Sequence, residues 1–179
     1  MKWGIENGRN NKYKKKTSTA RRTKKPEELN LDAKVTVRNI ADWTVGFARR
    51  ADGFNGDITI SPKGSIRLSR NEIITQVQNG NKLFNGLDGV GSHAILIIED
   101  KATRIEVGFE TEEKSQRVFS DALIEELFDI ISTDEFQMRF KENIRTRAEK
   151  YAAIDAIKRL KLNDYSKIRF VEDYTGYKL

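Results

Sequence analysis

The stretch that decides the fold runs from Ser69 to Asp100 and has the sequence SRNEIITQVQNGNKLFNGLDGVGSHAILIIED. Ser69 and Glu72 have the spacing of a capping box, the pair of residues that commonly opens a helix. Gly80 lies where a helix commonly ends in the left-handed conformation. These two signals predict a short helix over residues 70–79.

The next segment, residues 80–93, contains four glycines, and a glycine-rich loop can cradle a phosphate group. In a Walker A loop a lysine and a hydroxyl residue follow the last glycine, whereas Leu87 and Asp88 follow Gly86 here. A dinucleotide-binding loop follows a strand and opens a helix, and this loop does the reverse. The acids of a calcium-binding EF-hand loop are also missing. The loop therefore predicts a structural or partner-contact role, with no cofactor and no metal site.

The only histidine of the chain, His93, lies where this loop becomes a strand. An imidazole titrates near neutral pH and is a common general base. However, no nucleophile motif accompanies it, so the sequence favours a histidine that is hydrogen-bonded to fix the loop. We expect no catalytic residue and no enzymatic activity, and an activity around His93 is the less favoured alternative.

Alternation of apolar and polar residues predicts the strands of this protein. It is found in residues 33–48, in a hairpin formed by residues 57–61 and 65–68, and in residues 104–109. Residues 94–99, AILIIE, are apolar on both faces and are predicted to form the central strand. The expected fold is α+β: an antiparallel sheet or small partly open barrel of about five strands with one short inserted helix.

At Thr111 the apolar period changes from two to about 3.6 residues, which predicts helices. One helix is expected over residues 112–131, and a second begins at Ser132 and continues to about Leu162, so that the two form a hairpin on the sheet. The last residues hold three tyrosines, which favours a strand or an arm laid on a neighbouring molecule. The expected divisions are a basic arm at 1–30, a β-rich core at 31–110, the helical hairpin at 111–162 and an aromatic C-terminal strand or arm at 163–179.

The net charge of +6 is divided unevenly along the chain. Residues 1–26 carry ten Lys or Arg against one acid, a net +9, while the remaining residues carry 23 bases and 26 acids, a net −3. Low hydrophobicity and like charges predict that the N-terminal arm is disordered when free. Clustered cations gain affinity for nucleic acid by releasing counterions from phosphates, although a solubilising tail or an arm that wraps a protein neighbour fits the same composition. The residues expected to make these contacts are Lys12, Lys14, Lys15, Lys16, Arg21, Arg22, Lys24 and Lys25.

Two further sets of candidate contact residues lie outside the basic cluster. The second predicted helix carries a basic face that either tracks phosphates or is simply a solvated surface with ion pairs. This face comprises Arg139, Arg145, Arg147, Lys150 and Lys158. Aromatic residues that we expect to contact a protein partner are Trp3, Phe54, Phe84, Tyr174 and Tyr177.

The chain has no cysteine, which excludes disulfides, thiolate metal sites and cysteine nucleophiles. Its longest apolar run, residues 94–98, is far shorter than the roughly 20 residues that span a bilayer. The N-terminus lacks the apolar segment of a signal peptide. We expect no membrane partner and no export by that route.

Residues 56–100, GDITISPKGSIRLSRNEIITQVQNGNKLFNGLDGVGSHAILIIED, resemble small uncharacterised bacteriophage proteins. The resemblance covers about a quarter of the chain, brings no named functional family and carries over no site residues. It implies a phage product made in the bacterial host cytoplasm and either free there or incorporated in a virion.

The leading hypothesis is a non-enzymatic architectural protein of a bacteriophage particle or nucleoprotein assembly. Its core would dock on protein neighbours, with a homo-oligomer as one option, while the basic arm contacts nucleic acid or adjacent subunits. The alternative is a soluble nucleic-acid-binding regulatory or replication protein that uses the arm together with the basic helix face.

Overall fold

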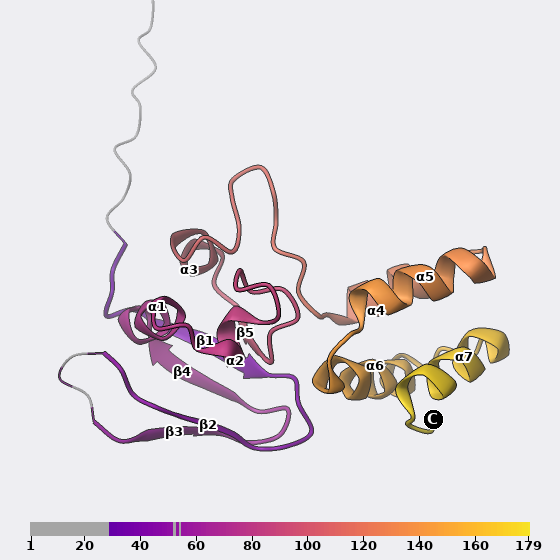
Figure 1. The fold of residues 1–179 in the computed structure, drawn as a ribbon, viewed down its shortest axis with the longest axis horizontal. Coiled ribbons are helices and arrows are strands. Elements are labelled where there is room, and N and C mark those ends of the chain that lie inside the picture. Colours follow the sequence, from indigo (N-terminus) through magenta and orange to yellow (C-terminus); the bar gives the residue numbers. More distant parts are fainter. Residues whose placement is uncertain (1–28, 52, 54) are drawn as a thin grey trace, which may run out of the picture.

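The computed structural model describes residues 29–51, 53 and 55–179 (Figure 1). The predicted disorder of the basic arm and the contact roles of Trp3 and Phe54 lie outside these residues. In the described part the fold is α+β, with seven helices and two small antiparallel sheets. Figure 1 shows the strands and the first three helices on one side of the molecule and the last four helices on the other. We call residues 29–110 the sheet part and residues 111–179 the helical part.

The larger sheet has three strands in the order β4-β1-β5, and both pairings are antiparallel. Val37 in the middle strand lies opposite Ile66 on one side and Ile98 on the other. Every second residue of the middle strand is buried, as its alternating sequence predicts. The smaller sheet pairs β2 with β3. The strands are β1 (Lys34–Asn39), β2 (Val45–Ala48), β3 (Asp57–Ile60), β4 (Ser65–Ser69) and β5 (Leu96–Ile98).

The expectation of one five-stranded sheet or partly open barrel is wrong: the described strands form two separate sheets and no closed barrel. The predicted hairpin at residues 57–68 does not form, because β3 pairs with β2 and β4 pairs with β1. The turn between them passes the chain from one sheet to the other. Buried Asn39 fixes this passage, since its amide nitrogen donates to the carbonyl oxygens of Trp43 at 2.9 Å and Ser61 at 3.0 Å.

The strand predicted as central, β5, is at the edge of its sheet. Its three residues are nevertheless buried, because its two faces pack on two different cores. Leu96 and Ile98 belong to the apolar cluster of the sheet part, whereas Ile97 belongs to the cluster of the helical part. Burial on both faces therefore reflects coverage by two cores rather than a central position in the hydrogen-bonded order.

Three helices accompany the sheets: α1 (Arg70–Gln78), α2 (Lys82–Asn85) and α3 (Lys101–Glu106). The predicted start and end of α1 are confirmed, because the Ser69 hydroxyl accepts the Glu72 amide and Gly80 has a positive φ of 72°. The predicted capping box is only half formed. The Glu72 carboxylate accepts the amides of Arg50 and Ala51 at 2.9 and 3.1 Å, which ties the 49–56 loop to the helix.

The strand expected over residues 104–109 is wrong, since residues 101–106 form α3. Asp100 is the reason, because its carboxylate accepts the Thr103 amide at 2.8 Å and caps a helix at this point. Arg104 then bonds backward to the Ile98 carbonyl and forward to buried Glu110. A local side-chain cap thus outweighs the alternation of Ile105, Val107 and Phe109.

The helical part contains four helices: α4 (Asp121–Phe128), α5 (Thr133–Asn143), α6 (Arg147–Leu160) and α7 (Tyr165–Thr175). The helix expected over residues 112–131 is limited to α4, which begins where the Ser120 hydroxyl accepts the Leu123 amide. The start at Ser132 is confirmed, because its hydroxyl accepts the Glu135 amide. The helix expected to continue to about Leu162 is instead broken at Ile144, and Thr146 opens α6 with a complete capping box.

The C-terminal segment is a helix, not the predicted strand or arm on a neighbour. Asp164 caps it by accepting the amides of Ser166 and Lys167, and Gly176 ends it in the left-handed conformation. Its apolar residues pack on the other helices of the same chain. Of the three C-terminal tyrosines, Tyr174 and Tyr177 thus pack within the chain, whereas Tyr165 is exposed.

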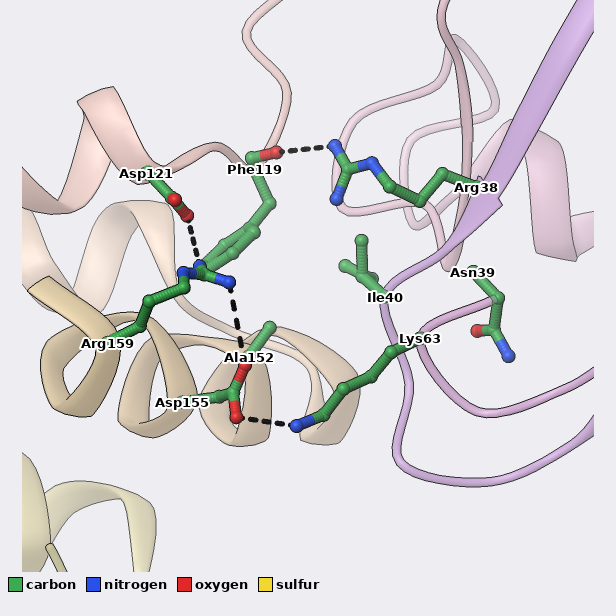
Figure 2. Close-up of a pocket in the computed structure, with 9 residues that line it drawn as sticks. All are labelled: Arg38, Asn39, Ile40, Lys63, Phe119, Asp121, Ala152, Asp155 and Arg159. Carbon is green, nitrogen blue, oxygen red and sulfur yellow. Dashed lines mark hydrogen bonds and ion pairs between the residues drawn. The ribbon is translucent and has the colours of Figure 1, made fainter. Parts of the chain in front are cut away.

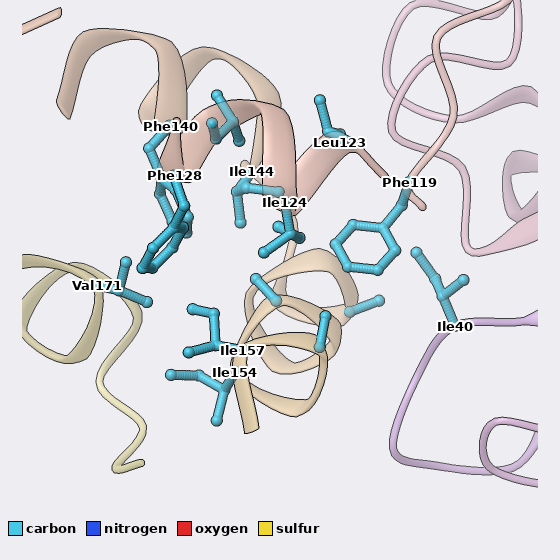
Figure 3. Close-up of a cluster of buried hydrophobic side chains, with 14 of the residues drawn as sticks. Ile40, Phe119, Leu123, Ile124, Phe128, Phe140, Ile144, Ile154, Ile157 and Val171 are labelled. Carbon is cyan, nitrogen blue, oxygen red and sulfur yellow. The ribbon is translucent and has the colours of Figure 1, made fainter. Parts of the chain in front are cut away.

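Two apolar clusters form the interior. The helical cluster contains Phe136, Phe140 and Ile144, all fully buried, and Figure 3 shows it reaching across to Ile40 of the sheet part. Trp43 packs against this cluster and also against the cluster of the sheet part. Among the described residues, no helix is long and apolar enough to cross a membrane.

Candidate functional site

Several charged and aromatic side chains meet where the sheet part contacts the helical part. We call this contact region the seam. Its sheet-part residues come from the turns after β1 and β3 and from the glycine-rich loop, and its helical-part residues come from the segment before α4 and from α6. They are Ile40, Trp43, Lys63 and His93 on one side, and Phe119, Arg147, Glu149 and Asp155 on the other.

At the first contact of the seam, His93 binds Glu149 of α6. The His93 Nδ1 atom lies 2.8 Å from Glu149 Oε1 and 3.1 Å from Oε2. Both side chains are largely enclosed, with exposed fractions of 16% and 5%. His93 has a φ of 59°, the left-handed region that non-glycine residues seldom adopt. The expectation of a histidine hydrogen-bonded to fix the loop matches this contact, which holds the loop against the helical part.

Glu149 is held in place by its own helix. Its Oε2 atom accepts the amides of Arg145 and Thr146, both at 2.9 Å, and the Thr146 hydroxyl at 3.0 Å. The same carboxylate therefore caps the start of α6 and orients the imidazole. Its buried charge is compensated by these donors, as a buried carboxylate requires.

The His93–Glu149 pair borders a pocket of about 190 Å³ whose other lining residues include Ser92, Arg117 and Asn143. A carboxylate that orients an imidazole is one arrangement of a general base. The neighbouring groups are engaged elsewhere: the Ser92 hydroxyl bonds to Asp88, and the Asn143 amide donates to the Arg139 carbonyl at 2.7 Å. Within the described residues no group of three His, Cys, Asp or Glu side chains is placed to hold a metal ion. Among the described residues, the pocket thus contains an imidazole oriented by a carboxylate, and no hydroxyl of its lining is hydrogen-bonded to that imidazole.

A second pocket of the seam, of about 140 Å³, lies between the end of β1 and α6 (Figure 2). Lys63 reaches Asp155 at 2.5 Å, and Arg159 bridges Asp121 at 2.5 Å and Asp155 at 3.9 Å. The hydrogen bond that Lys63 donates to the Asp155 carboxylate raises the pKa of Lys63 above its ordinary value. The third cation of the lining, Arg38, pairs with Glu99 at 2.7 Å. The charged side chains of this pocket are therefore paired within the chain, and the pocket joins the two parts.

The predicted basic helix face is partly used by the chain itself. Arg147 lies over the Trp43 ring at 5.0 Å, and Lys150 lies over the Tyr174 ring at 4.2 Å. Lys158 donates to the carbonyl of Lys178 at 3.0 Å. Arg139 is on α5, 3.8 Å from Glu142, and Arg145 is exposed in the connection before α6. The structure therefore spreads the five residues over two helices and a connection.

The predicted partner-contact aromatics that lie within the described residues also pack on the chain. Phe84 is fully buried and meets Phe47 edge-on at 5.4 Å, so it belongs to the core and offers no surface to a partner. Tyr174 stacks on Phe170, and its hydroxyl donates to the Ile144 carbonyl at 2.7 Å. Tyr177 meets Tyr151 edge-on at 5.7 Å.

Sequence reasoning missed Glu149, the residue on which the first seam contact depends. One signal was present, because Thr146 and Glu149 have capping-box spacing inside the apolar pattern of the long predicted helix. The pairing with His93, which is 56 residues away, has no such signal.

Comparisons with protein-family models, with curated proteins and with solved structures gave no match for this chain.

Proposed function

We propose that this protein is a non-enzymatic architectural component of a nucleoprotein assembly, with a bacteriophage particle as the context that the sequence resemblance suggests. In this proposal the folded body docks on protein neighbours, and the basic N-terminal arm contacts nucleic acid. The single observation that carries the proposal is the division of charge, +9 in residues 1–26 against −3 in the rest of the chain.

The contacts of the body support this division of roles. Several of its cations are bound within the chain: Lys63 and Arg159 by acids, Arg147 and Lys150 by aromatic rings. A phosphate backbone would have to compete with these partners. The arm, in contrast, has ten bases and only one acid, Glu6, to pair with them.

The energetic basis is the release of counterions from nucleic acid. Each phosphate contact by Lys or Arg contributes about 0.9 to the slope of log affinity against log salt for duplex DNA. Eight arm cations at residues 12–25 would therefore give a steep salt dependence with little sequence preference. Such binding suits a component that holds nucleic acid of any sequence.

The experiment compares two matched triple variants of the full chain in DNA and RNA binding over a range of salt. Replacing Lys14, Lys15 and Lys16 with Gln is expected to lower the salt slope by about three times 0.9 on duplex DNA. The control replaces three exposed lysines of the body, Lys34, Lys82 and Lys114, with Gln. The net charge therefore changes equally in the two variants. Equal losses in both variants, or no salt-dependent binding by the unchanged protein, would reject the nucleic-acid role of the arm.

The second candidate is a nucleic-acid-binding regulatory or replication protein that uses the face around the start of α6. The observation that favours it is the net +5 of residues 136–179, which carry eleven bases and six acids. Arg145→Glu tests it, because this exposed side chain stands beside the α6 cap without forming it. Two results would favour this candidate over the first. Arg145→Glu would cause a severe loss of nucleic-acid affinity, and the arm variant would still bind nucleic acid with selectivity for sequence or strand.

A further inference from the structure

An exposed surface on the helical part has a composition that helix stability does not explain. It lies on α4, on the connection to α5 and on the first turn of α5. Residues 125–135, which form this surface, carry five acids and no base, a net −5. Ile131, in the middle of this surface, is 98% exposed. We call this surface the acidic end; its exposed residues are Glu125, Glu126, Asp129, Ile131, Asp134 and Glu135.

The position of these acids is unfavourable for α4. Helix C-termini carry a partial negative charge, and an acid there costs about 0.3–1 kcal/mol at low salt. Glu125, Glu126 and Asp129 lie in or directly after the last turn of α4, which has no basic residue. Only Asp134 and Glu135, at the start of α5, are placed where the helix favours them. The acids at the end of α4 therefore need another reason.

Few of these charges are neutralised by the chain. Among the described residues, Glu125, Asp129, Asp134 and Glu135 form no ion pair. Glu126 is near Arg117, but the closest atoms are 3.8 Å apart and both side chains are more than half exposed. Exposed pairs of this kind contribute about 0–1 kcal/mol, so this contact leaves the charge available to a stronger partner.

Between α4 and α5 the same surface contains a groove of about 230 Å³. Leu127 and Ile130 form its apolar lining, and Glu126 and Glu135 line it as well, together with Arg117 and Arg139. Lysine and arginine have long apolar stems that lie along such a lining while the charged group meets a carboxylate. The two glutamates and two arginines of the lining balance, so the negative charge comes from Glu125, Asp129 and Asp134 around the groove. The acidic end as a whole thus fits a basic, extended peptide and repels a phosphate backbone.

We propose that the acidic end binds the basic N-terminal segment, residues 9–25, of a second copy of this chain. Charge complementarity favours this occupant, since these residues contain nine Lys or Arg and no acid. Residues 1–28 could span up to roughly 100 Å when extended, which is enough to reach a neighbouring molecule. This contact deepens the proposed function, because it uses the same arm, and it gives that assembly a means of joining its copies.

The arm and the acidic end are attached to opposite sides of the molecule. The first described residues of the chain are tied to the sheet part, where Leu31 and Ala33 accept the amides of Asn71 and Arg70. Figure 1 shows this indigo segment on the side of the molecule away from α4 and α5. A contact between different surfaces of two copies is head-to-tail, and repeating it can add further copies in an open filament. The arm would then bind either the next copy or nucleic acid, so the two partners compete.

The test measures the mass of the full-length protein by sedimentation velocity over a range of concentrations. At about 50 mM salt the mass is expected to rise with concentration, and at about 500 mM salt the chain is expected to be monomeric, because screening weakens contacts between exposed charges. Replacing Glu126 and Glu135 with Lys should weaken association roughly tenfold or more, since two attractive contacts become repulsive. The matched control is Glu112→Lys with Glu113→Lys, which changes the net charge equally at exposed acids outside the groove.

Two results would overturn this inference: a monomeric protein at every concentration in low salt, or equal association by the groove variant and its control. Circular dichroism of both variants shows whether a loss of association is due to unfolding. If a variant does unfold, Glu135→Gln replaces it, and this single change should reduce association by a smaller amount if the groove is the site. Nucleic-acid binding is measured on the same samples. Association without nucleic-acid binding would reject the nucleic-acid role of the arm and support its docking on the acidic end. Nucleic-acid binding without association would support the nucleic-acid role and reject the docking.

Discussion

The interior of the sheet part and the interior of the helical part are stabilised by different kinds of side chain. Seven polar or charged residues are buried in the described structure, and six of them lie in the sheet part. Glu149 is the exception, and it faces the sheet part through His93. The interior of the helical part is instead built from apolar side chains, with phenylalanines in mutual contact.

The reason for this difference is the supply of backbone hydrogen bonds. A helix satisfies most of its own amides and carbonyls, so its interior face can be wholly apolar. Short strands and long loops leave many backbone groups unpaired, and buried ones must find side-chain partners. Asn39 and Glu72 provide such partners in the sheet part. Asn39 binds the backbone of the segments that join the two sheets, and Glu72 binds the backbone of the connection between β2 and β3. The sheet part should therefore be sensitive to polar substitutions, and the helical part to loss of volume.

The largest effect is expected for Phe140→Ala in the helical part. Phe140 is fully buried and contacts the rings of Phe136, Phe170 and Tyr174. Removing its ring should lower the free energy of unfolding by about 3–5 kcal/mol, through lost transfer energy and the cavity left behind.

Urea unfolding followed by both tryptophan fluorescence and far-ultraviolet circular dichroism measures this change. Phe84→Ala, at an equally buried position of the sheet part, is the matched variant. We expect one coincident transition in each variant, because Trp43 and Ile95 pack on both clusters. Two separate transitions would contradict the shared interior and show that the parts unfold independently.

A somewhat smaller effect, on the order of 3 kcal/mol, is expected for Gly86→Ala in the sheet part, because its backbone conformation is essentially restricted to glycine. Gly86 has a φ of 66° and a ψ of −151°, and an added Cβ atom would meet the Ser92 carbonyl. Gly89→Ala is the control, since Gly89 also has a positive φ of 82° but open space around it. Its cost should be only about 1 kcal/mol, the ordinary penalty of the left-handed conformation. Equal losses of thermal stability in the two variants would show that the close approach to Ser92 is unimportant.

At the seam, His93→Ala is expected to destabilise the protein by about 1–3 kcal/mol, the usual cost of leaving a buried polar group without a partner. Buried Glu149 would lose the imidazole while keeping the donors of its own helix cap. His93→Asn serves as the control for backbone strain, because asparagine tolerates a positive φ but is too short to replace the ring. If both variants unfold at the same urea concentration as the unchanged protein, the two parts are held together without this contact.

The smallest effect concerns the acid stability of the sheet part. The hydrogen bond from Arg104 holds the pKa of Glu110 below its ordinary value of 4.5. A carboxyl group whose pKa is lowered by folding contributes stability that is present above its unfolded pKa and is lost as the pH falls through its folded pKa. The contribution of this group to stability should therefore be lost as the pH is lowered below about 5.

Glu110→Gln removes the titrating group and should reduce that loss, whereas the exposed control Glu112→Gln should leave it intact. Urea unfolding at each pH provides the measurement. An identical pH profile for Glu110→Gln and the unchanged protein would mean that the Arg104 contact does not contribute to acid stability.

The sequence by itself determined the local features of this protein. Ser69, Gly80 and Ser132 mark helix ends correctly because a cap involves only a few neighbouring residues. The alternating residues of β1 predict its buried face for the same reason. The charge of the basic arm is likewise a property of composition and needs no fold.

Only the tertiary structure decided how these pieces are joined. The apolar strand β5 has two buried faces because two cores cover it, and no local pattern distinguishes that from a central position. The strand pairing, the helix at 101–106 and the C-terminal helix also depend on contacts or caps that compete with the apolar period. His93 meets Glu149 across 56 residues, and such a pairing exists only once both parts have folded and packed together.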